Sequence, residues 1–371
     1  MKILPGIGLA ACFFMVCFGC SCNNQAQKDA PRKLPVVYQA FSDTLCPFYV
    51  KTNTFPHKRK DLAIGLLGSD PKRDSLLLAT FLQADFFDNI TGQLHPDGIC
   101  DFAGENFLYH RYIPDPSFLS DSTIAFRQQA VCETALLIRP TVSQDATKFV
   151  VIACDAAAQL AQQDMRDLLE DARLHIPSTS TLWTGIRTTE QLLQETPGTL
   201  GIFASPQAVA LNSYQSLLSH ENTFLQRYDT TNTPIPNELI PVFHFDFSRG
   251  HMQYKGARYN PTYMYIRSEA NYVRYFTVML VEQLRHGNAR KPLTYLLLGD
   301  ISLAPHTAVI TETLRQLRDY RKEGRYVYRH LISPQVTLID PARETAIETY
   351  RLLLQDKTPA YRPTRGVIRN K

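Results

Sequence analysis

Apolar runs alternate with amphipathic stretches along most of this chain. Leu62–Leu67, Phe149–Ala153 and Leu200–Ala204 are almost wholly apolar, as expected for strands whose two faces are both buried. Helical spacing of apolar residues occurs in stretches such as Asp74–Gln83 and Ser122–Ile138. This alternation predicts an α/β fold built on mostly parallel sheets with helices on both faces.

The same patterns extend the predicted order through the rest of the chain. Further strands are expected at Asn106–Tyr109, Leu239–Phe247, Tyr295–Leu298 and Val336–Ile339, and further helices at Ala156–Ala172, Asn271–Arg285, Thr307–Tyr320 and Ala342–Leu354. Asp85–Glu105 breaks this rhythm, because it is rich in Asp, Gly and Pro and shows no convincing helical spacing. We predict that it is a loop on the α/β frame.

The first residues have the composition of a bacterial export signal. An apolar segment, Ile3–Phe18, is short for a membrane span and leads to a small residue followed by Cys20. That ending is typical of a lipoprotein. We therefore expect residues 1–19 to be a signal peptide, Cys20 to carry the lipid, with Cys22 as the alternative, and residues 20–60 to form a tether and lead-in. The expected location is the cell envelope, on the periplasmic or outer-membrane face.

Length, charge and cysteine usage narrow the class further. More than 300 residues follow the signal, which suits two domains. The formal net charge of +4 is small and no basic stripe is interleaved with aromatic residues, so no nucleic-acid partner is expected. Among the body cysteines, Cys46, Cys100, Cys132 and Cys154, none forms a CxxC pair, which argues against zinc. An oxidising compartment would allow disulfides among them, with no indication of which would pair.

Four segments, in this order, resemble the aspartate/glutamate racemase family, and glutamate racemase in particular. They are Val151–Ala157 (VIACDAA, similar to VIACNTA), Leu200–Pro206 (LGIFASP), Leu297–Leu303 (LLGDISL, in place of LGCTHYP) and Val336–Ala342 (VTLIDPA). The resemblance covers roughly Leu62 to Leu354.

The resemblance implies two similar α/β domains that face each other across a cleft, with the last helix returning to pack on the first domain. We expect a first domain of residues 61–177 with 325–356, a second of 178–324, and a tail of 357–371. In the family, each domain contributes one acid/base residue from the carboxyl end of a strand, which is where open α/β sheets place ligands.

Cys154 and Asp300 stand at the positions of the family's two acid/base cysteines. Racemisation removes the Cα proton from one face and returns a proton to the other, so it needs two such groups. Asp300 replaces the second thiol, and an ordinary carboxylate is a weak base for this proton. Asp155 replaces an Asn of the family, and we expect its charge to raise the pKa of Cys154.

Further positions match substrate-binding positions of the family. They are Ser69, Asp155, Ala156, Ser205 and Ser302. Two departures bear on them: Gly68 stands where the family has an Asp, with the glycine-rich turn after it lost, and Ser302 replaces a His.

These features lead to an expected function. We expect a lipid-anchored protein that binds a small acidic molecule or amino acid in the cleft, with the family's catalysis altered or lost. The alternative is an active racemase or isomerase in which Cys154 and Asp300 form the two-sided pair. Neither a cofactor nor a metal is expected.

Two other groups of polar residues have competing interpretations. His244 and Asp246 share one face of a strand, where a metal or acid/base cluster competes with the polar face of an edge strand, which we prefer. Asp97, Asp101 and Glu105 share a loop, where a solvated loop is preferred to a calcium site because the spacing matches no EF-hand.

Overall fold

The computed structural model describes most of the chain after residue 32. The described residues are 33–52, 59–112, 123–141, 146–171, 175–204, 208, 211, 213–220, 226–228, 234–236, 243–246, 251–254, 257–259, 268–286 and 291–360. Cys20 and Cys22, with the whole expected signal peptide, lie outside them. Among the described residues, no helix combines the length and apolar content needed to cross a bilayer.

The first sheet, sheet A, consists of four parallel strands in the order β2-β1-β3-β4. They are β1 (Ala63–Gly68), β2 (Phe107–Arg111), β3 (Thr147–Ile152) and β4 (Ser178–Ser180). Every residue of β1 and β3 is buried, because both strands lie inside the sheet with helices over both faces. The strands predicted from the apolar runs Leu62–Leu67 and Phe149–Ala153 are therefore confirmed as central strands.

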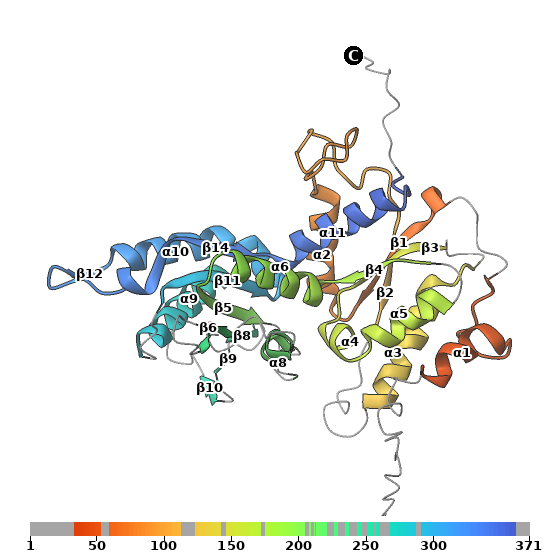
Figure 1. Ribbon diagram of the computed structural model, residues 1–371, viewed down its shortest axis with the longest axis horizontal. Coiled ribbons are helices and arrows are strands. Elements are labelled where there is room, and N and C mark those ends of the chain that lie inside the picture. The colour runs from red at the N-terminus through yellow and green to blue at the C-terminus, as the bar shows by residue number, and fades with distance from the viewer. Residues whose placement is uncertain are drawn as a thin grey trace, which may run out of the picture. The chain divides into compact units, whose positions relative to one another are not determined.

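Helices cover both faces of sheet A (Figure 1). Helices α2 (Pro71–Gln83) and α11 (Pro341–Gln355) share one apolar cluster with the sheet, so the last helix does pack on the first sheet as expected. Helices α3 (Thr123–Ile138) and α5 (Gln162–Asp171) pack on the other face. Helix α1 (Pro35–Ser42) packs against α3 and α5, although the sequence indicated only a lead-in there.

The second sheet, sheet B, has six strands in the order β10-β9-β8-β5-β11-β14. They are β5 (Thr199–Ala204), β8 (Phe243–Asp246), β9 (His251–Tyr254), β10 (Ala257–Tyr259), β11 (Leu293–Gly299) and β14 (Ile332–Ile339). Strands β5, β8, β11 and β14 are parallel, and β9 and β10 extend the sheet antiparallel beyond β8. Because β8 lies between β5 and β9, the expectation that His244 and Asp246 belong to an edge strand was wrong.

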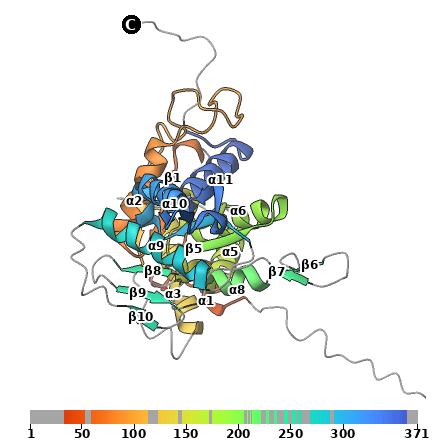
Figure 2. The same cartoon turned by 90° about the vertical axis from the view of Figure 1, so that its left-hand side faces the viewer.

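Two pairs of helices enclose sheet B. Helices α6 (Thr181–Glu195) and α8 (Ser213–His220) share an apolar cluster with one face, and α9 (Glu269–His286) and α10 (Thr307–Asp319) share another cluster with the opposite face. Helices α6 and α11 lie side by side (Figures 1 and 2), and the hydroxyls of Thr184 and Thr345 are 2.7 Å apart between them.

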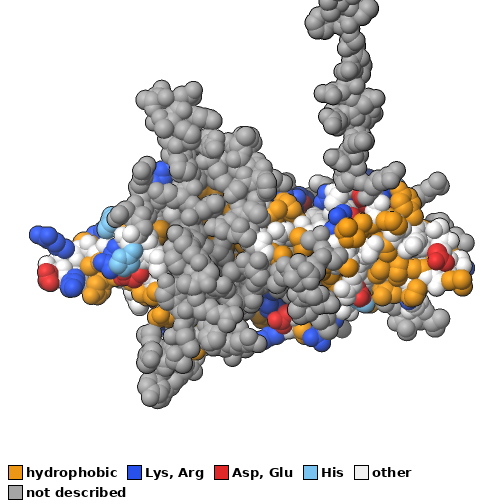
Figure 3. Space-filling model, turned by 90° about the horizontal axis from the view of Figure 1, so that it is seen from below, with side chains coloured by type: hydrophobic (Ala, Val, Ile, Leu, Met, Phe, Trp, Pro, Cys, Tyr) orange, Lys and Arg blue, Asp and Glu red, His pale blue; other side chains and the backbone are white. Residues whose placement is uncertain are grey.

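The remaining elements are short. They are α4 (Asp155–Leu160), β6 (Gln226–Tyr228), β7 (Pro234–Pro236), β12 (Arg321–Lys322), β13 (Arg325–Tyr326) and the 3-10 helices η2 (Arg59–Asp61), η4 (Ile301–His306) and η5 (Arg329–Leu331). Basic side chains are visible at the hairpin of β12 and β13 (Figure 3).

Three local features differ from the expected order. The single helix expected at Ala156–Ala172 is two helices, because the backbone of Ala161 leaves the helical region at the end of α4. Strand β4 pairs with β3 in sheet A, and β14 pairs with β11 in sheet B. The expected domain boundaries placed β4 in the second domain and β14 in the first. The structure places β4 in sheet A and β14 in sheet B.

Candidate functional site

The expected acid/base residues follow the carboxyl ends of two central strands, one in each sheet. Cys154 comes two residues after β3 and is the N-cap residue of α4. Asp300 comes directly after β11 and is the N-cap residue of η4. Both are buried, with 0% and 3% of their surface exposed. The positions agree with the general rule that parallel sheets offer polar groups at the carboxyl ends of their strands.

Arg73 links the two sheets at this place. It extends from the first turn of α2, and its side chain is only 12% exposed. Its Nη2 donates a hydrogen bond to Oδ2 of Asp155 at 3.5 Å, and its Nε lies 3.2 Å from Oδ1 of Asp300. One guanidinium therefore contacts the carboxylate that follows β3 and the carboxylate that follows β11.

These carboxylates stabilise the charged form of Arg73. Burial by itself would lower the pKa of the guanidinium, but Asp300, Asp155 and then Asp74 raise it, and the net shift is upward. Arginine is always charged at ordinary pH, so the shift measures how strongly the surrounding anions favour the cation. The centre therefore consists of one buried cation, Arg73, surrounded by the carboxylates of Asp300, Asp155 and Asp74.

Asp300 is also bound by its own helix. Its Oδ1 accepts hydrogen bonds from the backbone N–H of Ser302 at 3.0 Å and from the Ser302 hydroxyl at 2.8 Å. This is an ordinary N-cap arrangement, in which a side-chain oxygen satisfies a free N–H of the first turn. The structure thus brings Ser302 next to Asp300, with Asp300 occupied by Arg73 and Ser302 together.

Cys154 is in an environment that keeps its thiol protonated. The pKa of Cys154 is raised to about 11, mainly by burial and in smaller part by the charge of the neighbouring Asp155. Hydrogen bonds with the backbone of Ala157 and Ala156 and with the side chain of Ser69 lower it, but by less than burial raises it. Asp155 raises the pKa of Cys154 as expected, and the hydrogen bonds at the N-terminus of α4, which favour the thiolate, are outweighed by burial.

Gly68 stands where the resembled family has an Asp. The space that a side chain at this position would fill is taken by the carboxylate of Asp74. A Cβ on Gly68 would lie 2.1 Å from Oδ2 of Asp74, a residue of α2. That oxygen accepts hydrogen bonds from the backbone N–H of Asp70 at 3.0 Å and from the hydroxyl of Tyr109 at 2.9 Å. Burial raises the pKa of Asp74. The missing side chain at residue 68 thus makes room for a carboxylate supplied by the next helix.

Tyr214 completes the buried group from α8. Its hydroxyl donates to the carbonyl of Gly299 at 3.3 Å, and the absence of a side chain on Gly299 permits this approach. Burial, followed by the charge of Asp155, raises the pKa of Tyr214 well above its ordinary value. Tyr214 is therefore a neutral hydroxyl at the end of β11.

The structure gathers most of the residues that the sequence indicated. Cys154, Asp155, Ala156 and Ser69 lie together, and Asp155 is joined to Asp300 and Ser302 through Arg73. Ser205 lies outside the described residues, so its expected role stays a prediction.

Three members of the group were not singled out as site residues from the sequence: Arg73, Asp74 and Tyr214. The nearest signal was the position of Arg73-Asp74 in the first turn after β1, where helix N-termini usually attract anions, which makes an arginine unusual.

The loop carboxylates have other partners. Asp101 accepts hydrogen bonds from the backbone N–H groups of Phe86 and Phe87, and Glu105 forms a fully buried ion pair with Lys148 at 2.6 Å. No group of three or more potential metal ligands occurs within the described part of the chain. These carboxylates hold the loop together, so a calcium site there gains no support.

Comparisons with known proteins give structural likenesses only. No protein-family model matches the chain, and no curated protein does. A glutamate racemase isoform from Bacillus anthracis is similar at 16% identity and a TM-score of 0.48, covering 81% of this chain and 85% of that one.

Two further solved structures are a glutamate racemase from Francisella tularensis subsp. tularensis SCHU S4 in complex with D-glutamate and an aspartate racemase homologue from Pyrococcus horikoshii OT3. The first has 15% identity, a TM-score of 0.45 and coverage of 81% and 83%. The second has 10% identity, a TM-score of 0.38 and coverage of 79% and 99%. At such values the likeness concerns the fold and says nothing of activity.

Proposed function

We propose that this chain is a non-catalytic, lipid-anchored protein of the bacterial cell envelope, in which the racemase-like centre has become a structural ion-pair junction. The observation that supports this most is the contact of one guanidinium, Arg73, with both Asp155 and Asp300. The lipid anchor rests on the amino-terminal sequence ending at Cys20.

A two-sided proton exchange needs one group that takes the Cα proton and one that returns it. Asp300 is a poor candidate for the first task, because Arg73 and Ser302 already hold its carboxylate. Cys154 is a poor candidate for taking the proton, because a thiol with a pKa of about 11 rarely forms the reactive thiolate near neutral pH.

The same contacts argue against an anionic substrate at this centre. A ligand carboxylate would approach Asp155 and Asp300, two buried carboxylates that share a single guanidinium. Like charges so close together in a buried site repel strongly. We therefore do not place the small acidic molecule expected from the sequence between these residues.

The alternative activity is testable by proton exchange. The mature chain is incubated with D- and L-glutamate and D- and L-aspartate in D₂O, with a glutamate racemase as the positive control, and Cα deuteration is followed by NMR. We expect no deuteration above the protein-free rate. Deuteration that disappears in Cys154→Ser and in Asp300→Asn would overturn the proposal and establish the two-sided pair.

The anchor is tested separately. Cells expressing the full chain are labelled with a fatty acid that can be detected after extraction. We expect the label on the wild type and on Cys22→Ala, and none on Cys20→Ala. A label that is lost only in Cys22→Ala would move the lipidation site, and an unlabelled wild type would refute the anchor.

A further inference from the structure

Two cysteines lie where α1 packs on α3. Cys132 is part of α3, and Cys46 lies in the short segment that follows α1. This segment folds back on α1, because the N–H of Val50 donates to the carbonyl of Ala40 at 2.7 Å. Helix α1 itself lies beside α3 and α5 (Figure 1). Cys46 is therefore held on the face of sheet A that α3 covers.

A hydrogen bond fixes the position of this segment along α3. Nη1 of Arg139, the residue that follows α3, donates to the carbonyl of Pro47 at 2.7 Å. Arg139 comes about two helical turns after Cys132, so both side chains lie on the same side of the helix. Helical side chains lean toward the N-terminus. Pro47 therefore lies over the turns between Arg139 and Cys132, and Cys46 is its direct neighbour in the chain.

The two thiols also interact electrostatically. The pKa of Cys132 is raised to about 11, first by burial and next by the charge of Cys46. Glu133, which is adjacent to Cys132 in the chain, contributes less than Cys46 does. Charge interactions weaken with distance, so this order agrees with a Cys46 thiol that lies close to the thiol of Cys132.

The other two body cysteines do not fit such a pair. Cys154 is 0% exposed, so a dissolved oxidant does not reach its thiol. Cys100 packs on the apolar cluster of α2 and α11, and its thiol donates to the carbonyl of Leu82 at 3.2 Å. Cys46 and Cys132, in contrast, are both partly exposed.

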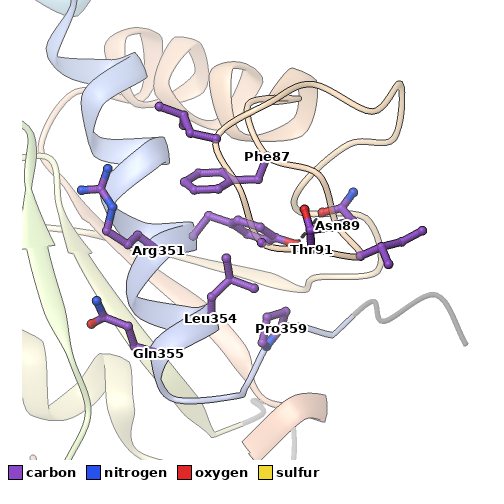
Figure 4. A pocket seen from close by; sticks show the side chains of 11 residues that line it. Phe87, Asn89, Thr91, Arg351, Leu354, Gln355 and Pro359 are labelled. Carbon is purple, nitrogen blue, oxygen red and sulfur yellow. Dashed lines mark hydrogen bonds between the residues drawn. The ribbon is translucent and has the colours of Figure 1, made fainter. Parts of the chain in front are cut away.

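The loop that carries Cys100 packs on α11 (Figure 4). Phe87 and Asn89 of this loop line a cavity of about 680 Å³ together with Leu354 of α11. Helices α11 and α3 cover opposite faces of sheet A. The sheet therefore separates Cys100 from Cys132.

We propose that Cys46 and Cys132 form a disulfide bond in the exported protein, which fastens the segment after α1 to α3. Both are free thiols in the structure, and both are accessible to an oxidant. The inference rests on the proposed envelope location, because structural disulfides persist in oxidising compartments.

The bond forms by thiol–disulfide exchange with a disulfide oxidant of the envelope. The thiolate of one cysteine attacks the oxidant's disulfide, which gives a mixed disulfide and releases one thiol of the oxidant. The second cysteine then attacks the sulfur of the first, which forms the bond and releases the oxidant's other thiol. The two cysteines together lose two electrons and two protons, and the oxidant takes up both.

The bond joins residues that are far apart along the chain. The loop that it closes, from residue 46 to residue 132, contains β1, α2 and β2. A cross-link over such a loop restricts the unfolded chain far more than the folded one, so it stabilises the folded state. Reducing the bond should lower the melting temperature by roughly 5 to 10 °C.

The pairing is tested on the purified full chain. The chain is reduced, freed of reductant and placed in a glutathione buffer rich in the oxidised form. Remaining thiols are blocked with N-ethylmaleimide, and tryptic peptides are mapped without reduction by mass spectrometry. We expect the peptide of residues 34–51 to be linked to that of residues 128–148, each of which contains one cysteine. Free or glutathione-bound Cys46 and Cys132, or either of them linked to another cysteine, would overturn the proposal.

Single variants test the stabilising role of the bond. In Cys46→Ser and in Cys132→Ser, dithiothreitol should no longer lower the melting temperature. Cys100→Ser is the matched control and should keep both the linked peptides and the response to dithiothreitol. A wild-type chain that contains the link and melts at the same temperature after reduction would show that the bond does not fasten the two segments.

A measurement in cells separates the pairing from the envelope location. Bacteria that express the full chain are lysed in N-ethylmaleimide, which blocks the thiols that are free in the cell, and the same two peptides are mapped. We expect the linked pair there as well. Cysteines that pair in the glutathione buffer but are blocked as free thiols in cells would contradict the oxidising location. Failure to pair in the buffer would contradict the disulfide itself.

Discussion

Replacing Arg73 by methionine tests whether the buried ion pairs hold the two sheets together. Methionine keeps much of the side-chain volume and removes the charge. Its loss leaves Asp155 and Asp300 buried, each with 4% or less of its side chain exposed, without their shared cation. The change should therefore destabilise the fold far more than the loss of a surface charge would.

The distances set the expected magnitude. Unit charges 3.2 to 3.5 Å apart attract by about 5 kcal/mol at an effective dielectric constant of about 20. Desolvation of the three groups offsets much of this attraction. Experience with buried pairs that lose one partner gives a loss of about 3–5 kcal/mol, and we expect Arg73→Met to lie in that range.

The assay is urea unfolding at pH 7, followed by circular dichroism. Lys72→Met is the matched control, because Lys72 is the neighbouring residue on α2 and its pair with Glu269 is exposed. An exposed pair contributes about 0–1 kcal/mol, so this variant should unfold close to the wild type.

A triple variant separates charge from packing. In Arg73→Met/Asp155→Asn/Asp300→Asn the two carboxylates that contact Arg73 are neutralised together with it, so most of the lost stability should return. A single variant that unfolds like Lys72→Met, or a triple variant no more stable than Arg73→Met, would refute the reasoning.

Three other outcomes are expected. With a thiol pKa of about 11, roughly one Cys154 in a thousand is ionised at pH 8. Iodoacetamide should therefore alkylate Cys154 far more slowly in the native chain than in the urea-unfolded chain, as measured by mass spectrometry. Equal alkylation rates in the two states would contradict this prediction. Burial raises the pKa of Asp101 from 3.8 to about 6, so its contribution to stability is complete below about pH 4 and is lost as the pH rises through 6. Unfolding of Asp101→Asn should accordingly depend less on pH between 4 and 7 than that of the wild type, and an equal dependence would contradict the shift. Gly68→Ala places a Cβ 2.1 Å from Asp74 and should cost about 1–3 kcal/mol in thermal or urea unfolding, whereas wild-type stability would show that Asp74 moves freely.

The central strands were predictable because burial on both faces leaves a direct mark on the sequence. Strands β1, β3 and β5 are buried at every position, and the greater part of each appears in the sequence as an apolar run. Helix α6 was missed although Leu182, Ile186 and Leu193 have helical spacing and Ser180 caps its first turn. Its many threonines and glutamines obscured that signal, since such residues are frequent in loops.

The candidate site was less predictable, because its contacts join distant parts of the chain. The strand-end positions of Cys154 and Asp300 followed from local motifs. The ion pair of Arg73 with Asp155 spans 82 residues and depends on how α2 packs against the ends of both central strands. No local sequence pattern encodes such a contact. Nor does a local pattern show that burial raises the pKa of Cys154 more than the hydrogen bonds at the N-terminus of α4 lower it.

The most direct test of the account is the NMR signal of the Arg73 side chain. In a chain labelled with ¹⁵N-arginine, its Nε–H resonance is assigned by its absence in Arg73→Lys. We expect slow exchange with water at pH 7, because the side chain is 12% exposed, and a shift of the resonance in both Asp155→Asn and Asp300→Asn. An Arg73 signal that exchanges like those of exposed arginines, or that responds to neither substitution, would contradict the junction and with it the proposed loss of catalysis.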